Sequence, residues 1–302
     1  MFGAHVPFAL PVPAMRPSLL RAAVVRSALA LAGLLAVVAP AAPLTAQDLS
    51  FPEMRWREIG PTRAGRARAV SGVASLPNTF YAGFDNGGVW RSTDYGANWV
   101  PIFDDQPTGS IGAIAVAPTN PNTIYVGSGA GIIRPDLAIG DGMYKSTDAG
   151  KTWTHLGLRE SQMIAAIAVD PRNENRLFVA VLGHPYGPNP ERGVFRSTDG
   201  GRTFEKVLYK DEYTSANEVI IDPSDPNTIY ATLWQQQQSF IEGQGFGNAG
   251  MGIFKSTDGG TTWTQLSDGL PPILQANIAI APSEPGTLYA VVAPGTGAIG
   301  FY

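Results

Sequence analysis

The chain has 302 residues, a formal net charge of −4 and no cysteine, and 44% of its residues are hydrophobic while 15% are charged. This composition excludes a disordered polyelectrolyte, a disulfide scaffold and any site built on cysteine thiolates, and the acidic balance gives no reason to expect nucleic acid. The 35 glycines and 25 prolines disfavour a helical bundle and favour many short strands joined by turns.

The first 46 residues have the layout of a cleaved export signal. Arg16, Arg21 and Arg26 form a basic region, an apolar run follows over residues 27–38, and small residues lead to Ala46. The run of about a dozen apolar residues is shorter than the roughly 20 needed to span a bilayer, so cleavage is favoured over a retained anchor. The sequence therefore predicts a signal peptide over residues 1–46 and a secreted or periplasmic protein, with no membrane segment after cleavage.

Residues 54–60 are predicted to form a single outer strand. The segment that begins at Trp56 resembles the segments that begin at Trp153 and Trp263, but no inner strands precede it. In a ring of sheets, a strand of this kind closes the last sheet and removes an open edge. We therefore expect residues 54–60 to close a fold that extends over residues 47–302.

One eight-residue motif then occurs four times. Each copy reads Ser-Thr-Asp, followed by a glycine and an aromatic residue, and each follows a short strand. An aspartate can accept hydrogen bonds from the N–H groups just after it, and glycine tolerates a positive φ, so the motif predicts a tight turn. The aspartates are predicted to close these turns and the aromatic residues to pack in the core. The pairs are Asp94 and Trp99, Asp148 and Trp153, Asp199 and Phe204, and Asp258 and Trp263.

A second repeat divides each unit into four strands. It is typified by Pro77-Asn78-Thr79, begins one strand, and follows another strand that is rich in small apolar residues. Each unit of about 50 residues thus contains short strands A to D, with the aspartate motif as the C–D turn. Such units predict an all-β protein, a β-propeller of four-stranded antiparallel blades. The predicted blades are residues 62–104, 109–158, 162–209, 215–268 and 275–302.

The last predicted blade is incomplete, because the chain ends where its strand C should lie. Roughly 4.7 blades are present at this repeat length. We expect the chain to be a fragment of a larger propeller. The alternative is a complete five-bladed ring in which Phe301-Tyr302 is an abbreviated strand C.

The aspartate motif resembles the Asp-box, or BNR, repeat, which occurs in sialidases, in sortilin-type ectodomains and in the xyloglucanases of glycoside hydrolase family 74. The resemblance extends from about residue 55 to the end of the chain. Its overall pattern is most similar to bacterial exported proteins described as sortilin N-terminal-like or as BNR-repeat glycosyl hydrolases. It implies the propeller fold with high specificity and a function with low specificity.

Asp85 is the candidate catalytic residue. Residues 81–91, which read Tyr-Ala-Gly-Phe-Asp-Asn-Gly-Gly-Val-Trp-Arg, resemble the first-blade segment of the xyloglucanases, in which the aspartate before x-Gly-Gly is the general base. An inverting glycosidase also needs a second carboxylic acid across the substrate. In that family the acid comes from a second propeller, and nothing in this chain can be matched to it. The alternative for Asp85 is a residue that caps a turn or loop.

The rim that carries the B–C loops and D–A connections is the candidate binding surface. Its B–C loops differ in length, at residues 128–141, 183–192 and 235–250, and length variation over a constant frame is typical of binding. Aromatic side chains beside carboxylates and amides suit sugars, whereas ordinary solvated loops are the alternative. The candidates are Arg134, Asp136, Asp141, His184, Tyr186, Glu191, Arg192, Trp234 and Glu242, together with Phe240 and Phe246.

We therefore expect an exported propeller that binds a polysaccharide or an extracellular polypeptide through this rim. One alternative is an inverting glycoside hydrolase of the xyloglucanase type, with Asp85 as general base and its acid outside this chain. Another is a structural or assembly scaffold. No cofactor and no metal site are predicted, because His155 and His184 do not stand at metal-ligand spacing.

Overall fold

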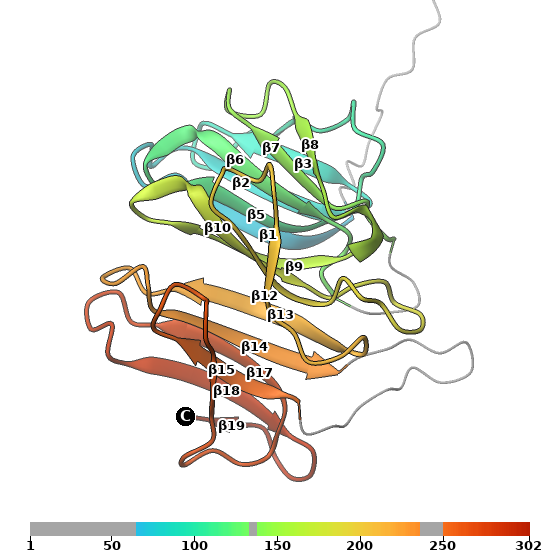
Figure 1. The fold of residues 1–302 in the computed structure, drawn as a ribbon. Coiled ribbons are helices and arrows are strands. Elements are labelled where there is room, and N and C mark those ends of the chain that lie inside the picture. The colour runs from blue at the N-terminus through green and yellow to red at the C-terminus, as the bar shows by residue number, and fades with distance from the viewer. Residues whose placement is uncertain (1–64, 133–137, 236–249) are drawn as a thin grey trace, which may run out of the picture. The chain divides into compact units, whose positions relative to one another are not determined.

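The computed structural model describes residues 65–132, 138–235 and 250–302. These residues form nineteen strands and one three-residue 3-10 turn, Arg159–Ser161 (Figure 1). The strands make four four-stranded sheets and one three-stranded sheet, and consecutive strands pair antiparallel within each sheet. No helix in the described ranges has the length and apolar character to cross a bilayer. The predicted all-β fold of antiparallel blades is confirmed.

Each sheet runs from strand A to strand D in chain order. The first contains β1 (Arg66–Gly72), β2 (Phe80–Asp85), β3 (Gly88–Ser92) and β4 (Val100–Pro101). The second contains β5 (Ile111–Ala117), β6 (Asn120–Ser128), β7 (Met143–Ser146) and β8 (Thr154–Gly157). The third contains β9 (Ile164–Asp170), β10 (Asn173–Val181), β11 (Gly193–Ser197) and β12 (Glu205–Leu208). The fourth contains β13 (Thr214–Ile221), β14 (Ile229–Gln235), β15 (Gly252–Ser256) and β16 (Thr264–Leu266). The fifth contains β17 (Ile273–Ile280), β18 (Leu288–Pro294) and β19 (Gly300–Phe301).

The sheets pack against one another in chain order through their A strands. Strand β1 contacts β5, β5 contacts β9, β9 contacts β13, and β13 contacts β17. Small residues permit this close approach: a Cβ on Gly127 would lie 2.4 Å from Cγ2 of Ile164 in the next sheet. An apolar layer fills each of the four junctions, so the core is a series of inter-sheet layers. Chain-order packing of this kind is the arrangement of propeller blades.

In every Asp-box the serine and the aspartate side chains both make the hydrogen bonds that close the turn. In the third box Ser197 Oγ donates to Asp199 Oδ1 at 2.8 Å and accepts from Gly201 N at 2.8 Å. Asp199 in turn accepts from N of Thr203 at 3.0 Å and from its hydroxyl at 2.7 Å. The same contacts recur in the other three boxes, with Asn98 in place of the threonine in the first. The box is thus a locally closed hydrogen-bonded loop.

The box turn is also tied to the A–B turn of its own sheet. The N–H group after each box aspartate donates to the carbonyl of an asparagine that lies just before strand B in the first and fourth sheets and within strand B in the second and third. Thus Gly200 N donates to Asn175 O at 2.8 Å, and Gly259 N donates to Asn227 O at 2.9 Å. The first two boxes make the equivalent bonds to Asn78 and Asn122. This contact links the two sequence repeats within each unit.

The residue after each box aspartate is left-handed, and in two boxes it is not glycine. Tyr95 has φ 61° and Ala149 has φ 58°, whereas glycines occupy this position in the third and fourth boxes. A non-glycine residue in this region costs roughly 1–2 kcal/mol. We expect Ala149→Gly to raise the free energy of unfolding by about 0.5–1 kcal/mol, measured by urea unfolding. The matched change Gly200→Ala should lower it, and an equal response of both variants would contradict the assignment.

The box carboxylates give the fold a defined acid sensitivity. Hydrogen bonds from Asn98 lower the pKa of Asp94 to about 2, and those from Thr152 do the same for Asp148. A carboxyl group whose pKa is lower in the folded state stabilises the fold above its unfolded pKa, near 3.8, and this stability is lost as the pH falls towards 2. We therefore expect the urea midpoint to fall between pH 4 and pH 2, and to fall less in Asp148→Asn. A midpoint that is constant over this range would refute the prediction.

The box aromatic residues pack across the junction to the preceding sheet. Trp153 donates from Nε1 to Ile102 O at 2.7 Å, and its ring lies edge-on to Phe103 at 5.1 Å. Phe204 and Trp263 are partly buried in the next two layers. Trp99 differs from the prediction of a core residue, because it is 37% exposed and no sheet precedes the first in the described residues.

A basic residue in strand C joins each of the first three sheets to the next box. Arg91 donates to Ala149 O at 3.0 Å, Lys145 to Gly200 O at 3.2 Å, and Arg196 to Gly259 O at 2.8 Å. In each pair the acceptor is the carbonyl of the residue after the box aspartate. This contact, which the repeats did not predict, links neighbouring sheets at their C–D turns.

The fifth sheet contains a two-residue strand C. Val292 pairs with Gly300 and Val291 with Phe301, and Ala290 and Tyr302 exchange backbone hydrogen bonds at 2.9 Å. The expectation that strand C is missing is corrected to this extent, since β19 begins it. The predicted signal peptide and the predicted closing strand 54–60 lie outside the described residues.

Candidate functional site

Asp85 stands at the end of β2, immediately before a two-residue hairpin. Asn86 and Gly88 both have positive φ, 60° and 68°, which lets the chain reverse within this short connection. The Trp90 indole donates to Gly87 O at 2.6 Å and braces the turn. The positive φ at Asn86 and Gly88 therefore explains the asparagine and the second glycine that follow Asp85. The hairpin places the Asp85 carboxylate at the B–C rim of the first sheet.

The Asp85 carboxylate is held by the beginning of the second sheet. Only 4% of Asp85 is exposed, and Ser110 Oγ lies 2.6 Å from its Oδ1 and 3.0 Å from Ala138 O. Burial lowers the pKa of the Arg68 guanidinium, and the negative charge of Asp85 opposes that shift. Asp85 is therefore a fixed, shielded carboxylate with a cation nearby rather than a mobile surface acid.

Hydrogen bonds to backbone carbonyls connect the rim segments around Asp85. Arg68 lies at a bulge in β1 and donates to Ala130 O at 2.7 Å and Gly131 O at 3.1 Å in the second sheet's B–C loop. Gly129 N donates to Ser110 O at 2.8 Å. The two Arg68 bonds cross from the first sheet to the second, and the Gly129 bond joins the segment before β5 to the segment after β6 within the second sheet.

Asp141 is the centre of a second rim cluster. Its carboxylate accepts from the Tyr144 hydroxyl at 2.7 Å and from Arg159 Nη1 at 3.1 Å. Burial, followed by the hydrogen bond and charge of Asp141, raises the pKa of the Tyr144 phenol. His155 Nε2 lies 2.7 Å from Asp141 O, and its Nδ1 accepts from Gly157 N. The cluster is largely satisfied internally, with the exposed Arg159 on its outer side.

The buried Arg192 side chain holds the third sheet's B–C loop through hydrogen bonds. It is fully buried and donates to the backbone carbonyls of His184 at 2.9 Å and Gly187 at 3.2 Å, and to Ser215 Oγ. Burial lowers the pKa of its guanidinium to about 10. Arg192 was predicted to contact a ligand. In this structure its buried guanidinium instead donates to loop carbonyls, so it does not face a ligand.

Asn189 joins the same loop to both neighbouring connections. Its side chain donates to Glu160 O at 2.8 Å, and its N–H group donates to Glu212 O at 2.9 Å. Glu191 lies beside it, and burial together with the charge of Glu160 raises the Glu191 pKa. The structure thus brings Glu160 and Glu191 close together on the rim.

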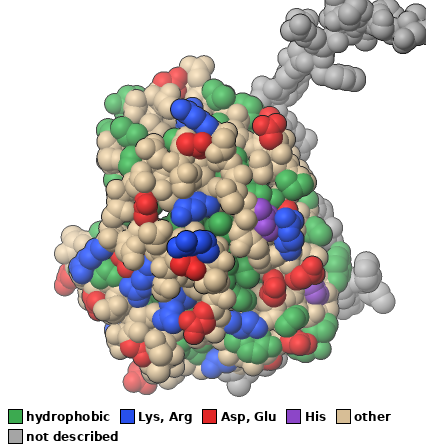
Figure 2. Space-filling model, turned by 45° about the horizontal axis from the view of Figure 1, so that its top comes forward, with side chains coloured by type: hydrophobic (Ala, Val, Ile, Leu, Met, Phe, Trp, Pro, Cys, Tyr) green, Lys and Arg blue, Asp and Glu red, His purple; other side chains and the backbone are tan. Residues whose placement is uncertain are grey.

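The remaining rim candidates are dispersed. Tyr186 is 38% exposed and His184 is half-buried, whereas Trp234 is 7% exposed and belongs to the core rather than to a ligand surface. Arg134, Asp136, Phe240, Glu242 and Phe246 lie outside the described residues. On the face shown in Figure 2, acidic and basic side chains are interspersed and no large patch of one sign stands out. Among the described residues, no group of three or more histidine, aspartate and glutamate side chains is placed to hold a metal ion.

Comparisons with known proteins agree with the repeats. A family profile described as sortilin, neurotensin receptor 3 (Sortilin-Vps10) matches residues 141–274. An ancestral glycoside hydrolase family 74 enzyme of known structure is 25% identical, with a TM-score of 0.62 over 80% of this chain and 29% of its own. The family 74 xyloglucanase of Xanthomonas campestris, 20% identical, matches with a TM-score of 0.57 over 82% of this chain and 37% of its own.

These repeats are Asp-boxes, and the fold is a β-propeller. Among curated proteins, the Asp-box propeller is similar to a xyloglucanase of a Paenibacillus species, 27% identical over 74% of this chain and 23% of the relative. It is also similar to a xyloglucanase of Hypocrea jecorina, 26% identical over 80% of this chain and 31% of the relative. The chain thus spans about a quarter to a third of the length of these relatives.

Proposed function

We propose that this propeller contributes the polysaccharide-binding rim and the general base of an exported glycoside hydrolase that acts on a β-glucan such as xyloglucan. Asp85 is the base. The supporting observation is an oriented carboxylate at the rim of the first sheet, in a chain similar to xyloglucanases over most of its length.

The environment of Asp85 suits a base that acts through water. In an inverting mechanism the base removes a proton from a water molecule, which attacks the anomeric carbon, while a separate acid protonates the leaving oxygen. Ser110 holds Oδ1 of Asp85, which leaves Oδ2 to orient the water. A carboxylate that is only 4% exposed is suited to contact with a small molecule such as water rather than direct attack on a sugar. The acid is not assigned to this chain.

The test measures reducing ends released from xyloglucan by this chain, wild type or variant, together with the polypeptide that supplies the acid. Asp85→Ala should abolish release while leaving polysaccharide binding within about twofold, because the base acts on water rather than on the glycan. Added azide should restore chain cleavage by Asp85→Ala, detected as a glycosyl azide of inverted configuration rather than as a new reducing end, because azide replaces the activated water as the nucleophile. Asp105→Ala, which removes an exposed carboxylate from the connection to the second sheet, is the matched control.

The same experiment separates the competing functions. Hydrolysis that is unchanged in Asp85→Ala would refute the assignment of the base. Saturable binding of xyloglucan by the wild type, without any hydrolysis when the polypeptide that supplies the acid is present, would favour a binding protein. Retention of extracellular polypeptides instead of glycans would favour the second class of ligand.

A further inference from the structure

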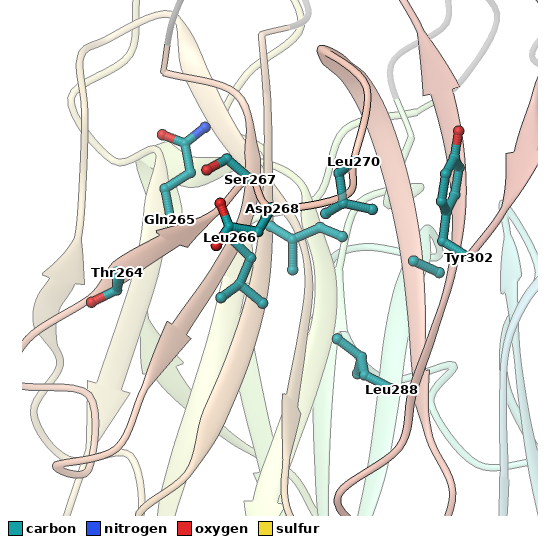
Figure 3. Close-up of a pocket in the computed structure, with 10 residues that line it drawn as sticks. Thr264, Gln265, Leu266, Ser267, Asp268, Leu270, Leu288 and Tyr302 are labelled. Carbon is teal, nitrogen blue, oxygen red and sulfur yellow. The ribbon is translucent and has the colours of Figure 1, made fainter.

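A polar pocket lies between the second and third sheets, on the rim that carries the Asp-box turns. Its volume is about 290 Å³, and it is lined by β7, β8 and the second box on one side and by Asn175 and the third box on the other. The pocket between the fourth and fifth sheets has a different lining, with Leu266, Leu270 and Leu288 in its wall (Figure 3). Because C–D turns and B–C loops lie at opposite ends of antiparallel strands, the polar pocket is separate from the rim of Asp85.

Two cationic side chains line this pocket, one from each sheet. Lys145 of β7 donates to Gly200 O at 3.2 Å, and Arg202 of the third box donates from Nε to Asp199 O at 3.1 Å. An ammonium has three donors and a guanidinium has five, so both side chains keep donors that have no acceptor within the described ranges. Burial lowers the pKa of the Lys145 ammonium, the charge of Glu174 opposes this shift, and the charge of Arg202 adds to it. An anion that enters the pocket is therefore attracted by two positive charges.

The carboxylate of Asp199 also lines the pocket, but its oxygens accept from its own turn. Oδ1 accepts from Ser197 Oγ at 2.8 Å and from Thr203 N at 3.0 Å, and Oδ2 accepts from the Thr203 hydroxyl at 2.7 Å. These bonds from Thr203 lower the pKa of Asp199, so its negative charge is stabilised within the turn. The remaining donors of Lys145 and Arg202 are therefore available to a ligand.

The next junction shows which group fills the equivalent place elsewhere in the chain. In the third sheet Arg196 stands opposite Glu205, donates to its Oε2 at 2.6 Å, and donates to Gly259 O at 2.8 Å. In the second sheet the equivalent pair is Lys145 and Thr154, and the shorter threonine side chain carries no carboxylate. Both residues line the pocket. The pocket therefore lies where the third junction holds a carboxylate against its basic residue.

The rest of the lining suits the ring and hydroxyl groups of a sugar. The hydroxyl groups come from Thr147, Thr152 and Thr154, and Asn175 adds a side-chain amide. Leu156 supplies an apolar surface for the C–H face of a ring. Small-molecule sites begin at about 300 Å³, so a pocket of about 290 Å³ suits a single sugar ring rather than an oligosaccharide.

We propose that this pocket binds a hexuronate sugar through its carboxylate. The carboxylate takes the place that Glu205 has at the third junction and accepts from Lys145 and Arg202, while the ring hydroxyls bond to the threonine hydroxyls and to Asn175. An acidic side chain of a polypeptide is a poorer occupant, because it would leave the hydroxyl groups of the pocket without partners. The inference does not depend on the proposed hydrolase, whose substrate carries no carboxylate.

The test is isothermal titration of the full chain with sodium glucuronate, glucose, glucuronoxylan and triglutamate. Glucuronate should bind saturably and glucose at least about tenfold more weakly, because only glucuronate accepts charge-assisted hydrogen bonds. Binding of glucuronoxylan as well would make the ligand a residue of a polysaccharide, whereas binding of the free sugar alone would make it a monosaccharide. No saturable binding of glucuronate, equal binding of glucose, or tighter binding of triglutamate than of glucuronate would overturn the proposal.

Protein variants locate the binding in this pocket. Thr154→Glu places a carboxylate opposite Lys145, so it should abolish glucuronate binding without lowering the thermal midpoint, whereas Thr264→Glu, at the same exposed position of the fourth sheet, should leave binding unchanged. Arg202→Gln should weaken binding at least about fivefold. Lys151→Gln, at the same exposed position of the second box, is its control and should not. Glucuronate binding that is unchanged in both Thr154→Glu and Arg202→Gln would overturn the proposal.

Discussion

Ser197→Ala is expected to lower the free energy of unfolding by about 2 kcal/mol. The Ser197 hydroxyl is 1% exposed, accepts from Gly201 N at 2.8 Å and donates to Asp199 Oδ1 at 2.8 Å. Its removal leaves the buried N–H group of Gly201 without a partner, and an unsatisfied buried donor costs about 1–3 kcal/mol. The effect is large for so small a change because one hydroxyl group holds both ends of the turn.

Urea unfolding of the purified chain measures this effect. Thr198→Ala is the matched control, because it also removes a hydroxyl group, one residue away, from an exposed side chain. It should change the free energy of unfolding by less than about 0.5 kcal/mol. Similar values for the two variants would mean that the serine is not the centre of the box.

Arg192→Met is expected to destabilise the fold by about 3 kcal/mol. Methionine replaces much of the side-chain volume but leaves the carbonyls of His184 and Gly187 and the Ser215 hydroxyl without their buried donor. The loss should be concentrated at the rim, because these carbonyls belong to the third sheet's B–C loop. Hydrogen exchange should therefore accelerate most in residues 183–192.

The control for this prediction is another arginine of the same rim. Arg159 is 61% exposed and pairs with Asp141 at 3.1 Å, so Arg159→Met should cost less than about 1 kcal/mol. An Arg192→Met protein with wild-type stability and unchanged exchange in residues 183–192 would show that the loop does not depend on the buried guanidinium.

The repeat unit was predictable from the sequence because its main contacts are local. Asp199 and Thr203 are four residues apart, and Ser197 and Gly201 are also four apart, so one short motif contains the donor, the acceptor and the left-handed glycine. The bond from Arg196 to Gly259 was missed, because its partners are 63 residues apart. A signal was nevertheless present, since a basic residue precedes Ser-Thr-Asp in all four copies.

The rim was predicted less well, because it is not repeated. Arg192 and Tyr186 were both candidates for ligand contact, yet one is fully buried and the other is 38% exposed. No periodicity in residues 183–192 distinguishes them. Arg192 is buried where it donates to Ser215 of the next sheet, and the loop is also held by the bond from Asn189 N to Glu212 O in the connection to that sheet.

The amino-acid sequence by itself determined the turns, the strand order and the four-stranded repeat unit. These features depend on hydrogen bonds between residues four apart and on short apolar strands, and both are visible in a short stretch of sequence. Tertiary structure alone decided that Ser110 holds Asp85 and that Arg192 supports a loop instead of facing solvent. Each of these depends on which neighbouring sheet comes within contact distance, and that proximity is set by packing of whole sheets rather than by local chain geometry.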